Sequence, residues 1–187
     1  MRIAILAWGS LLWDGGREFD DQHGPWQYDG PELNLEFSRV SKTRLGALTL
    51  VIDENHGVLT TVAWCVSTRR HLEDAVSDLR CREGTADRYI GRIVVNDTSR
   101  GSAPDTILIW AKGKNLDAVV WTSLRSNFAE KTGEPSFSVK AAIDYMKTLS
   151  PAGKAKAAEY VWRAPEFVQT PLRLALQQEP WFSTPRR

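Results

Sequence analysis

The segment Ile3 to Leu11 reads Ile-Ala-Ile-Leu-Ala-Trp-Gly-Ser-Leu. An unbroken apolar run that ends at Gly9 and Ser10 is typical of a strand buried on both faces, followed by a tight turn. Such a turn leaves consecutive backbone N–H groups without a ladder partner, and glycine lets a ligand approach them closely. The segment therefore predicts a central strand that opens onto a pocket for a carboxylate or an oxyanion. An ordinary turn has the same pattern.

Downstream of this strand, stretches rich in β-branched and large apolar residues predict more strands. Residues 14–31 are dense in turn-forming residues and predict a long surface loop. Residues 53–57 supply turn chemistry, so we expect a β-hairpin around them. We also expect the last two strands to pair antiparallel. The expected strands are Leu35 to Val40, Ala47 to Ile52, Val58 to Val66, Tyr89 to Val95 and Thr106 to Ala111.

Helical spacing of apolar residues predicts a helix that begins near Leu72, with Ser67 or Thr68 as its cap and Gly84 as its stop. The last third of the chain is dominated by helical patterns. The helices expected there are Leu116 to Phe128, Val139 to Leu149 and Ala152 to Trp162.

Strands before helices favour an α+β fold, with a curved or barrel-like sheet and helices packed on it. We expect one domain over 1–187, with mostly strands and one helix over 1–112 and a helical extension over 113–187.

The overall charge argues against nucleic acid and anionic membranes as partners. Lys and Arg number 24 against 23 Asp and Glu, so the formal charge of +1 supplies no attractive field for phosphates. Hydrophobic residues make up 42% of the chain and charged residues 25%, which is usual for a folded globular protein.

The cysteines and histidines argue against a disulfide framework and a metal site. Cys65 and Cys81 are isolated in sequence, and His23, His56 and His71 have no ligand spacing. We therefore expect buried free thiols, no metal and no cofactor. The N-terminal apolar run is too short for a signal peptide or a membrane span, so we expect a cytoplasmic protein.

Glu83 ends the predicted helix between Arg82 and Gly84, where a carboxylate can face a cavity at a helix terminus. A solvated surface glutamate has the same pattern. Of the eight Trp residues, Trp8, Trp13 and Trp26 lie near the proposed loop and can wall a pocket.

Together these segments resemble the γ-glutamylcyclotransferase superfamily, most of all its ChaC-like branch. Members open with a strand and a Tyr-Gly-Ser-Leu loop, often followed by Leu or Ile and Trp, and here Trp8-Gly9-Ser10-Leu11-Leu12-Trp13 stands in that place. The segment Leu79 to Gly84 resembles the family's Arg-Glu segment, which carries its catalytic glutamate. The resemblance covers roughly residues 1–95. Trp8 replaces the family's usual tyrosine, and the chain also departs from the family after Glu83.

The resemblance implies an enzyme that needs no cofactor or metal. The α-amino group of a γ-glutamyl compound attacks its own γ-carbonyl carbon, closes 5-oxoproline and expels an amine. Glu83 would be the catalytic proton carrier, provided that burial raises its basicity and the guanidinium groups of Arg80 and Arg82 point to solvent. Trp8, Gly9, Ser10 and Leu11 would bind the substrate, with Trp8 as a pocket wall that sets substrate preference.

Two other classes of function stay open from the sequence. A non-catalytic protein of the same fold would bind a small amino-acid-like ligand, and an unrelated α+β interaction module would carry these motifs by chance. A serine hydrolase is disfavoured because Ser10 lacks the Gly-x-Ser-x-Gly elbow. The sequence leaves open which amine is released and which oligomer forms.

Overall fold

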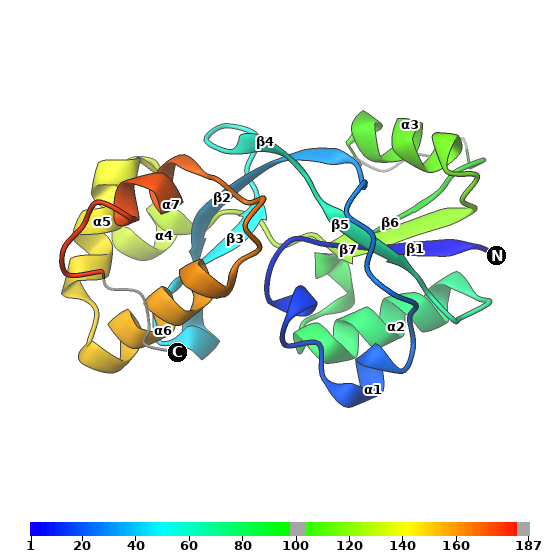
Figure 1. Cartoon of the computed structure of the whole chain (residues 1–187), viewed down its shortest axis with the longest axis horizontal. Coiled ribbons are helices and arrows are strands. Elements are labelled where there is room, and N and C mark those ends of the chain that lie inside the picture. The colour runs from blue at the N-terminus through cyan, green and yellow to red at the C-terminus, as the bar shows by residue number, and fades with distance from the viewer. Residues whose placement is uncertain (98–103, 183–187) are drawn as a thin grey trace. The chain divides into compact units, whose positions relative to one another are not determined.

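The computed structural model describes residues 1–97 and 104–182 of the chain. Strands form two sheets and helices flank them, which confirms the α+β class (Figure 1). Neither sheet closes into a barrel within the described residues. The chain divides into two compact units. The first unit comprises Met1–Leu33 and Thr61–Leu124, and the second comprises Asn34–Thr60 and the chain from Arg125 onward.

The sheet of the first unit has the strand order β5-β1-β7-β6, so the predicted central position of the first strand is confirmed. β1 runs antiparallel to β5 and parallel to β7, with Ile5 opposite Cys65 on one side and Val120 on the other. β6 pairs antiparallel with β7. The strands are β1 (Ile3–Ala7), β5 (Ala63–Val66), β6 (Ile90–Val94) and β7 (Ala118–Thr122).

Helices α2 and α3 lie on opposite sides of this sheet (Figure 1). Ile3, Ile5 and Ala7 point from β1 into a buried cluster with Ala75 and Leu79 of α2. All of β1 is buried, as its unbroken apolar run predicts. The helical elements of the first unit are α1 (Arg17–Asp20), α2 (Leu72–Glu83), α3 (Asp105–Gly113) and the 3₁₀ turns Ser10–Leu12 and Asp87–Tyr89.

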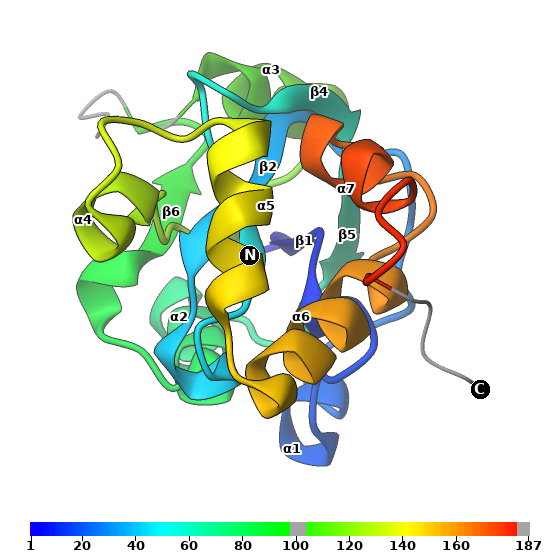
Figure 2. The same cartoon turned by 90° about the vertical axis from the view of Figure 1, so that its left-hand side faces the viewer.

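The second unit has the strand order β3-β2-β4 and carries the C-terminal helices. Figure 2 shows α5 in front of β2, with α6 and α7 beside it. Each of α5, α6 and α7 starts at a hydroxyl cap: Ser138, Ser150 and Thr170 accept from Ala141, Gly153 and Arg173 N–H. The elements are β2 (Glu32–Val40), β3 (Leu48–Ile52), β4 (Val58–Thr61), the 3₁₀ turn Lys42–Arg44, α4 (Phe128–Thr132), α5 (Val139–Thr148), α6 (Pro151–Arg163) and α7 (Pro171–Leu176).

The hairpin predicted around residues 53–57 is wrong, because β2 lies between β3 and β4. Gly57 passes so close to β2 that a Cβ atom there would lie 2.6 Å from the Asn34 carbonyl carbon. The turn thus carries the chain across the start of β2 rather than back along β3. The predicted strand Val58 to Val66 also divides into β4 and β5, which belong to different sheets.

Two predictions of element type are wrong, one strand and one helix. Thr106 to Ala111, expected as a strand, lies in α3, and Leu116 to Phe128, expected as a helix, contains β7. β6 therefore pairs with β7 and not with residues 106–111. In α3 the buried residues Ile107, Leu108 and Ala111 follow helical spacing, while Ile109 is 70% exposed. A short apolar run fits a buried strand and a helix equally well by pattern alone, and packing decides between them.

The predicted helix over residues 72–83 is confirmed, but its cap is not. His71 occupies the N-cap position and provides no side-chain cap, whereas Ser67 Oγ accepts from Arg69 N–H, at 3.1 Å, before the helix begins. Gly84 ends the helix as predicted, with a left-handed φ of 57°.

Candidate active site

The end of β1 leads into a single 3₁₀ turn rather than an open loop. Leu12 N–H donates to Gly9 O at 3.0 Å, and Asp14 N–H donates to Ser10 O at 2.7 Å. Trp8, Gly9 and Leu11 are buried, and Ser10 is half-buried. Because the first N–H groups of a helical turn have no acceptor within that turn, Ser10 and Leu11 can offer theirs to a ligand.

Glu83 is the last residue of α2, and Arg82 holds it in an ion pair. Arg82 Nη1 lies 2.9 Å from Glu83 Oε1, and the two side chains are only 11% and 17% exposed. The expectation that both arginines point to solvent is therefore wrong for Arg82, whereas Arg80 is exposed. Glu83 is therefore part of a partly buried ion pair and not an unpaired carboxylate.

The same guanidinium group ties Glu83 to the segment that follows the 3₁₀ turn. Arg82 Nη2 donates to the backbone oxygen of Asp14. On the buried side, Leu11 belongs to the same core cluster as Leu79 of α2. The structure thus brings the end of α2 and the turn after β1 together through Arg82 and through apolar packing.

A cavity of about 720 Å³ lies beside this junction, within the first unit. Its size is in the range of small-molecule sites. The turn residues Gly9, Ser10 and Leu11 are not among its lining residues, and Glu83 is not either. The lining residues come from the predicted surface loop, from Arg69 just before α2, and from α2 itself. They are Asp14, Gly15, Gly16, Glu18, Phe19, Gln22, Arg69, Asp78, Cys81 and Arg82.

Arg69 and Asp78 form the main ion pair of the cavity. Arg69 Nε and Nη2 donate to the two carboxylate oxygens of Asp78 at 2.7 and 3.0 Å, a bidentate arrangement. The hydrogen bond to Asp78 raises the pKa of Arg69 above its ordinary value. Neither residue is predicted from the sequence, because no helical or strand period links positions 69 and 78.

The tryptophans differ in their surroundings. Trp8 is buried, and Trp13 and Trp26 are half-buried. The centroid of the Trp26 ring lies 4.7 Å from that of His23, with the two rings tilted by 48°. Trp26 packs against the core cluster that contains Ala75 and Leu79 of α2, so it anchors the loop to the core.

The cysteines of the first unit are both free thiols. Cys65 is buried in β5, where desolvation strongly raises the pKa of its thiol. Cys81 is exposed at the cavity, so the expectation of two buried thiols is wrong for Cys81.

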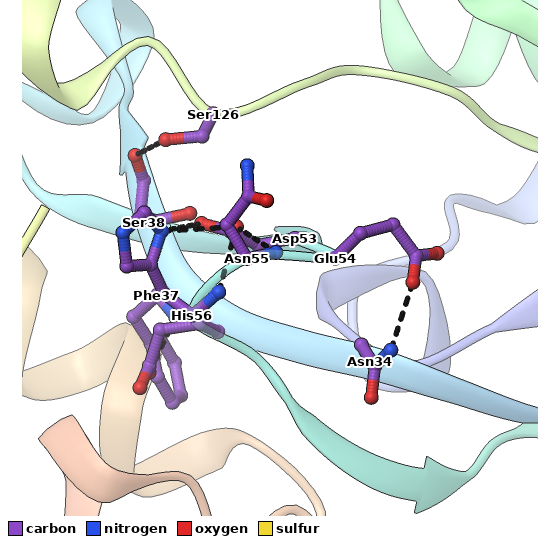
Figure 3. Close-up of polar contacts among 9 residues, drawn as sticks. Asn34, Phe37, Ser38, Asp53, Glu54, Asn55, His56 and Ser126 are labelled. Carbon is purple, nitrogen blue, oxygen red and sulfur yellow. Dashed lines mark hydrogen bonds and ion pairs between the residues drawn. The ribbon is translucent and has the colours of Figure 1, made fainter. Parts of the chain in front are cut away.

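The second unit holds a polar cluster around the buried Asp53 (Figure 3). Asp53 Oδ1 accepts from Asn55 N–H at 3.2 Å and from His56 N–H at 3.1 Å, and the His56 ring lies at 3.2 Å. Burial alone would raise the pKa of Asp53, but the Ser38 hydroxyl, His56 and the Asn55 N–H together lower it. The carboxylate therefore closes the turn after β3.

Glu36 is the other buried carboxyl of the second unit. Its oxygens accept from Phe37 N–H at 2.7 Å and from Leu172 N–H at 3.3 Å, so it joins β2 to the first turn of α7. Burial raises the pKa of Glu36, against the lowering effect of Thr170 and these N–H groups. Its contacts are those of a residue that anchors a helix.

The part of the chain that the structure describes contains no group of three or more His, Cys, Asp or Glu side chains able to hold a metal ion. None of the described helices is long and apolar enough to cross a membrane.

No protein-family model, curated protein or solved structure matches this chain. The case for its function therefore rests on its own residues.

Proposed function

We propose that this protein is a γ-glutamylcyclotransferase-like enzyme, which converts a γ-glutamyl compound to 5-oxoproline and releases an amine. The observation that carries the proposal is the Arg82 bridge, which ties Glu83 to the backbone just after the Gly9 to Leu12 turn. The motifs that resemble the family's substrate loop and catalytic glutamate thus lie at one junction, next to a cavity.

In this reaction the substrate's α-nitrogen forms a bond to its own γ-carbonyl carbon, and the bond from that carbon to the leaving nitrogen breaks. The attacking ammonium group loses two protons as it becomes the N–H of the lactam ring. The leaving amide nitrogen gains one proton as it departs as an amine and a second as that amine becomes an ammonium ion, so the protons balance. Glu83 accepts a proton from the attacking nitrogen and delivers a proton to the leaving nitrogen, which is general acid–base catalysis worth roughly 10²–10⁴-fold. A γ-glutamyl chain held in a curled conformation adds a proximity effect.

Arg82 and the turn serve this step in different ways. The Arg82 guanidinium keeps Glu83 in the ionised form that can accept a proton, and it also makes this carboxylate a weaker base than one without an arginine partner. Its bond to Asp14 O fixes the pair in place. The N–H groups of Ser10 and Leu11 donate to the oxyanion that forms on the γ-carbonyl oxygen. Trp8, which is buried directly after β1, helps to hold the turn in place.

The same proposal includes the finer fold and the compartment. We assign the chain a γ-glutamylcyclotransferase-like fold on the basis of the motif order along residues 1–95. A cytoplasmic location fits two free cysteines, one buried and one exposed.

A panel assay tests the proposal. The purified protein is incubated with glutathione, a γ-glutamyl dipeptide and a γ-glutamyl alkylamide, and 5-oxoproline and released amine are both quantified. We expect equal amounts of the two products from at least one substrate. Saturable binding of these compounds without 5-oxoproline would favour the non-catalytic ligand-binding protein instead, and neither binding nor product would favour an interaction module.

A further inference from the structure

The two units differ in charge, although the whole chain is nearly neutral. The second unit contains 13 Lys and Arg against 9 Asp and Glu, whereas the first contains 11 against 14. The overall charge of +1 therefore conceals a second unit with a net positive charge. Two segments of this unit, residues 37–52 and 145–158, contain three Lys or Arg each and no Asp or Glu.

The fold brings these two segments together at one corner of the second unit. Tyr145 of α5 donates its hydroxyl to the backbone oxygen of Gly46, at 2.9 Å, in the turn between β2 and β3. A Cβ atom at Gly153, in the first turn of α6, would lie 2.8 Å from the backbone oxygen of Leu45 in the same turn. The turn therefore packs against both helices where α5 ends and α6 begins.

Basic side chains from the turn and from both helices gather around this contact. Lys147 of α5 and Lys154 of α6 flank Trp181, each with its ammonium nitrogen 5.8 Å from the centre of the indole ring. We call this surface the basic corner, and it consists of Lys42, Arg44, Leu45, Lys147 and Lys154.

The carboxylates next to the basic corner are shared among several cations. Glu159 lies 2.7 Å from Lys156 and 3.6 Å from Arg163. Lys156 in the first place, and also Arg163 and Arg44, lower the pKa of Glu159. Glu179 lies 3.1 Å from Lys147. Two carboxylates among this many cations leave the surface with an excess of positive charge.

Leu45 occupies the turn in a conformation that does not favour leucine. Its side chain is 55% exposed, and its φ of 56° lies in the left-handed region that suits glycine or asparagine. Neither the exposure nor the backbone strain stabilises the folded protein. An exposed leucine next to two cations is instead suited to enter the acyl region of a bilayer while the cations stay among the headgroups.

We propose that the basic corner is a docking surface for an anionic lipid bilayer. Cations at a protein surface are attracted to acidic headgroups over about one Debye length, roughly 10 Å at 0.1 M salt. Burial of Leu45 adds an apolar contribution. A nucleic acid would attract the same cations, but its phosphate backbone offers no apolar region to cover Leu45. This inference does not rest on the proposed function.

Sedimentation with lipid vesicles tests the inference. The full-length protein is mixed with vesicles of phosphatidylcholine alone or with vesicles that contain one third phosphatidylserine, at low and at high salt. We expect binding to the phosphatidylserine vesicles at low salt to be at least about tenfold tighter than binding to phosphatidylcholine alone. High salt should remove most of this difference, because it screens the cations.

Replacing the two cations of the turn should weaken binding. Each cation near an anionic surface contributes about fivefold, so Lys42→Gln combined with Arg44→Gln should cost about tenfold or more. Lys131→Gln combined with Lys140→Gln is the matched control, since it removes the same charge from exposed positions of the same unit outside the basic corner. It should change the affinity by less than about threefold.

The apolar contribution is tested separately at Leu45. Leu45→Asn keeps a residue that tolerates the left-handed conformation, so the turn should still fold, and it should weaken vesicle binding by about threefold or more. Leu174→Asn is the control, because Leu174 is also exposed, at 48%, but lies in α7 outside the basic corner. It should leave binding unchanged.

Three results would overturn the inference. They are no preference for phosphatidylserine vesicles, equal losses in the two double variants, and unchanged binding by Leu45→Asn. A single-stranded RNA oligonucleotide is tested in parallel, and binding of this RNA without binding of vesicles would also overturn it. Because vesicle binding is measured without turnover, none of these results bears on 5-oxoproline formation.

Discussion

At the scale of single residues, Arg82 decides how Glu83 can act. Its guanidinium lies 2.9 Å from the carboxylate and also binds the Asp14 carbonyl. A base that moves a proton between two nitrogens must be ionised at the start and must keep its place after it takes the proton. Arg82 favours the ionised carboxylate of Glu83. Its hydrogen bond to the Asp14 carbonyl does not depend on the charge of Glu83, so Arg82 stays in place after Glu83 takes the proton.

Trp8 stands where the γ-glutamylcyclotransferase motif that this sequence resembles has a tyrosine, and it is buried. We predict that Trp8→Tyr changes KM or the ranking of substrates more than it changes kcat, because the residue shapes the turn and touches no transferred proton. Trp8→Ala should instead destabilise the fold by about 3–5 kcal/mol, the usual cost of truncating a buried tryptophan. Kinetics and urea denaturation measure the two effects. A collapse of kcat with every substrate in a folded Trp8→Tyr protein would contradict this role.

At the scale of elements, the end of α2 at Gly84 determines the position of Glu83. Gly84 has a φ of 57°, and a Cβ atom there would meet nothing within 4 Å. We predict that Gly84→Ala destabilises the protein by about 1–2 kcal/mol through backbone strain alone. Gly113→Ala at the end of α3 is the matched control, since it too meets open space but lacks the positive φ. It should be neutral or stabilising. If the two substitutions changed the midpoint of thermal unfolding equally, the positive φ of Gly84 would not be the cause of the destabilisation.

The turn after β3 depends on ionised Asp53. The pKa of this carboxyl is lower in the folded protein than its ordinary value of 3.8, so the stabilisation is complete above that pH and is lost as the pH falls through the folded value. We predict that Asp53→Asn costs about 1–3 kcal/mol of unfolding free energy at pH 7, because the Asn55 and His56 N–H groups lose a charged acceptor. Urea denaturation at several pH values should show that the difference in unfolding free energy between wild type and Asp53→Asn becomes smaller below pH 3.8. A gap that stays constant or widens on acidification would contradict this.

The elements also show what a sequence can predict. β1, α2 and its Gly84 stop, and the helices over residues 139–163 were predicted, because each carries a long periodic or unbroken pattern with a clear terminus. α3 and β7 were exchanged, because both are short apolar runs whose type is set by neighbours far along the chain. β7 is a strand because β1 and β6 lie on either side of it.

The site was predicted in part for the same reason. The turn at Gly9 and the helix end at Glu83 are local signals. The ion pairs of Arg82 and Arg69 depend on side chains that only the fold brings within reach.

At the scale of the whole molecule, every residue of the proposed site belongs to the first unit. The cavity, the turn after β1 and α2 all lie within Met1–Leu33 and Thr61–Leu124. The chain leaves this unit within β2 and returns at Thr61, the last residue of β4, so the second unit is an insertion followed by a C-terminal extension. Its buried carboxyls, Glu36 and Asp53, are engaged in holding α7 and the turn after β3.

The measurement that tests the central claim most directly is the rate of 5-oxoproline formation by Glu83→Gln protein. Glutamine keeps the shape of the side chain and removes its ability to carry a proton. Glu73→Gln is the control, because it makes the same change at the 74% exposed start of the same helix. We predict that Glu83→Gln loses at least about 10²-fold of kcat while it still binds substrate, and that Glu73→Gln keeps full activity. Retention of more than about a tenth of wild-type turnover by Glu83→Gln would contradict the account, since it is incompatible with a general base of that strength.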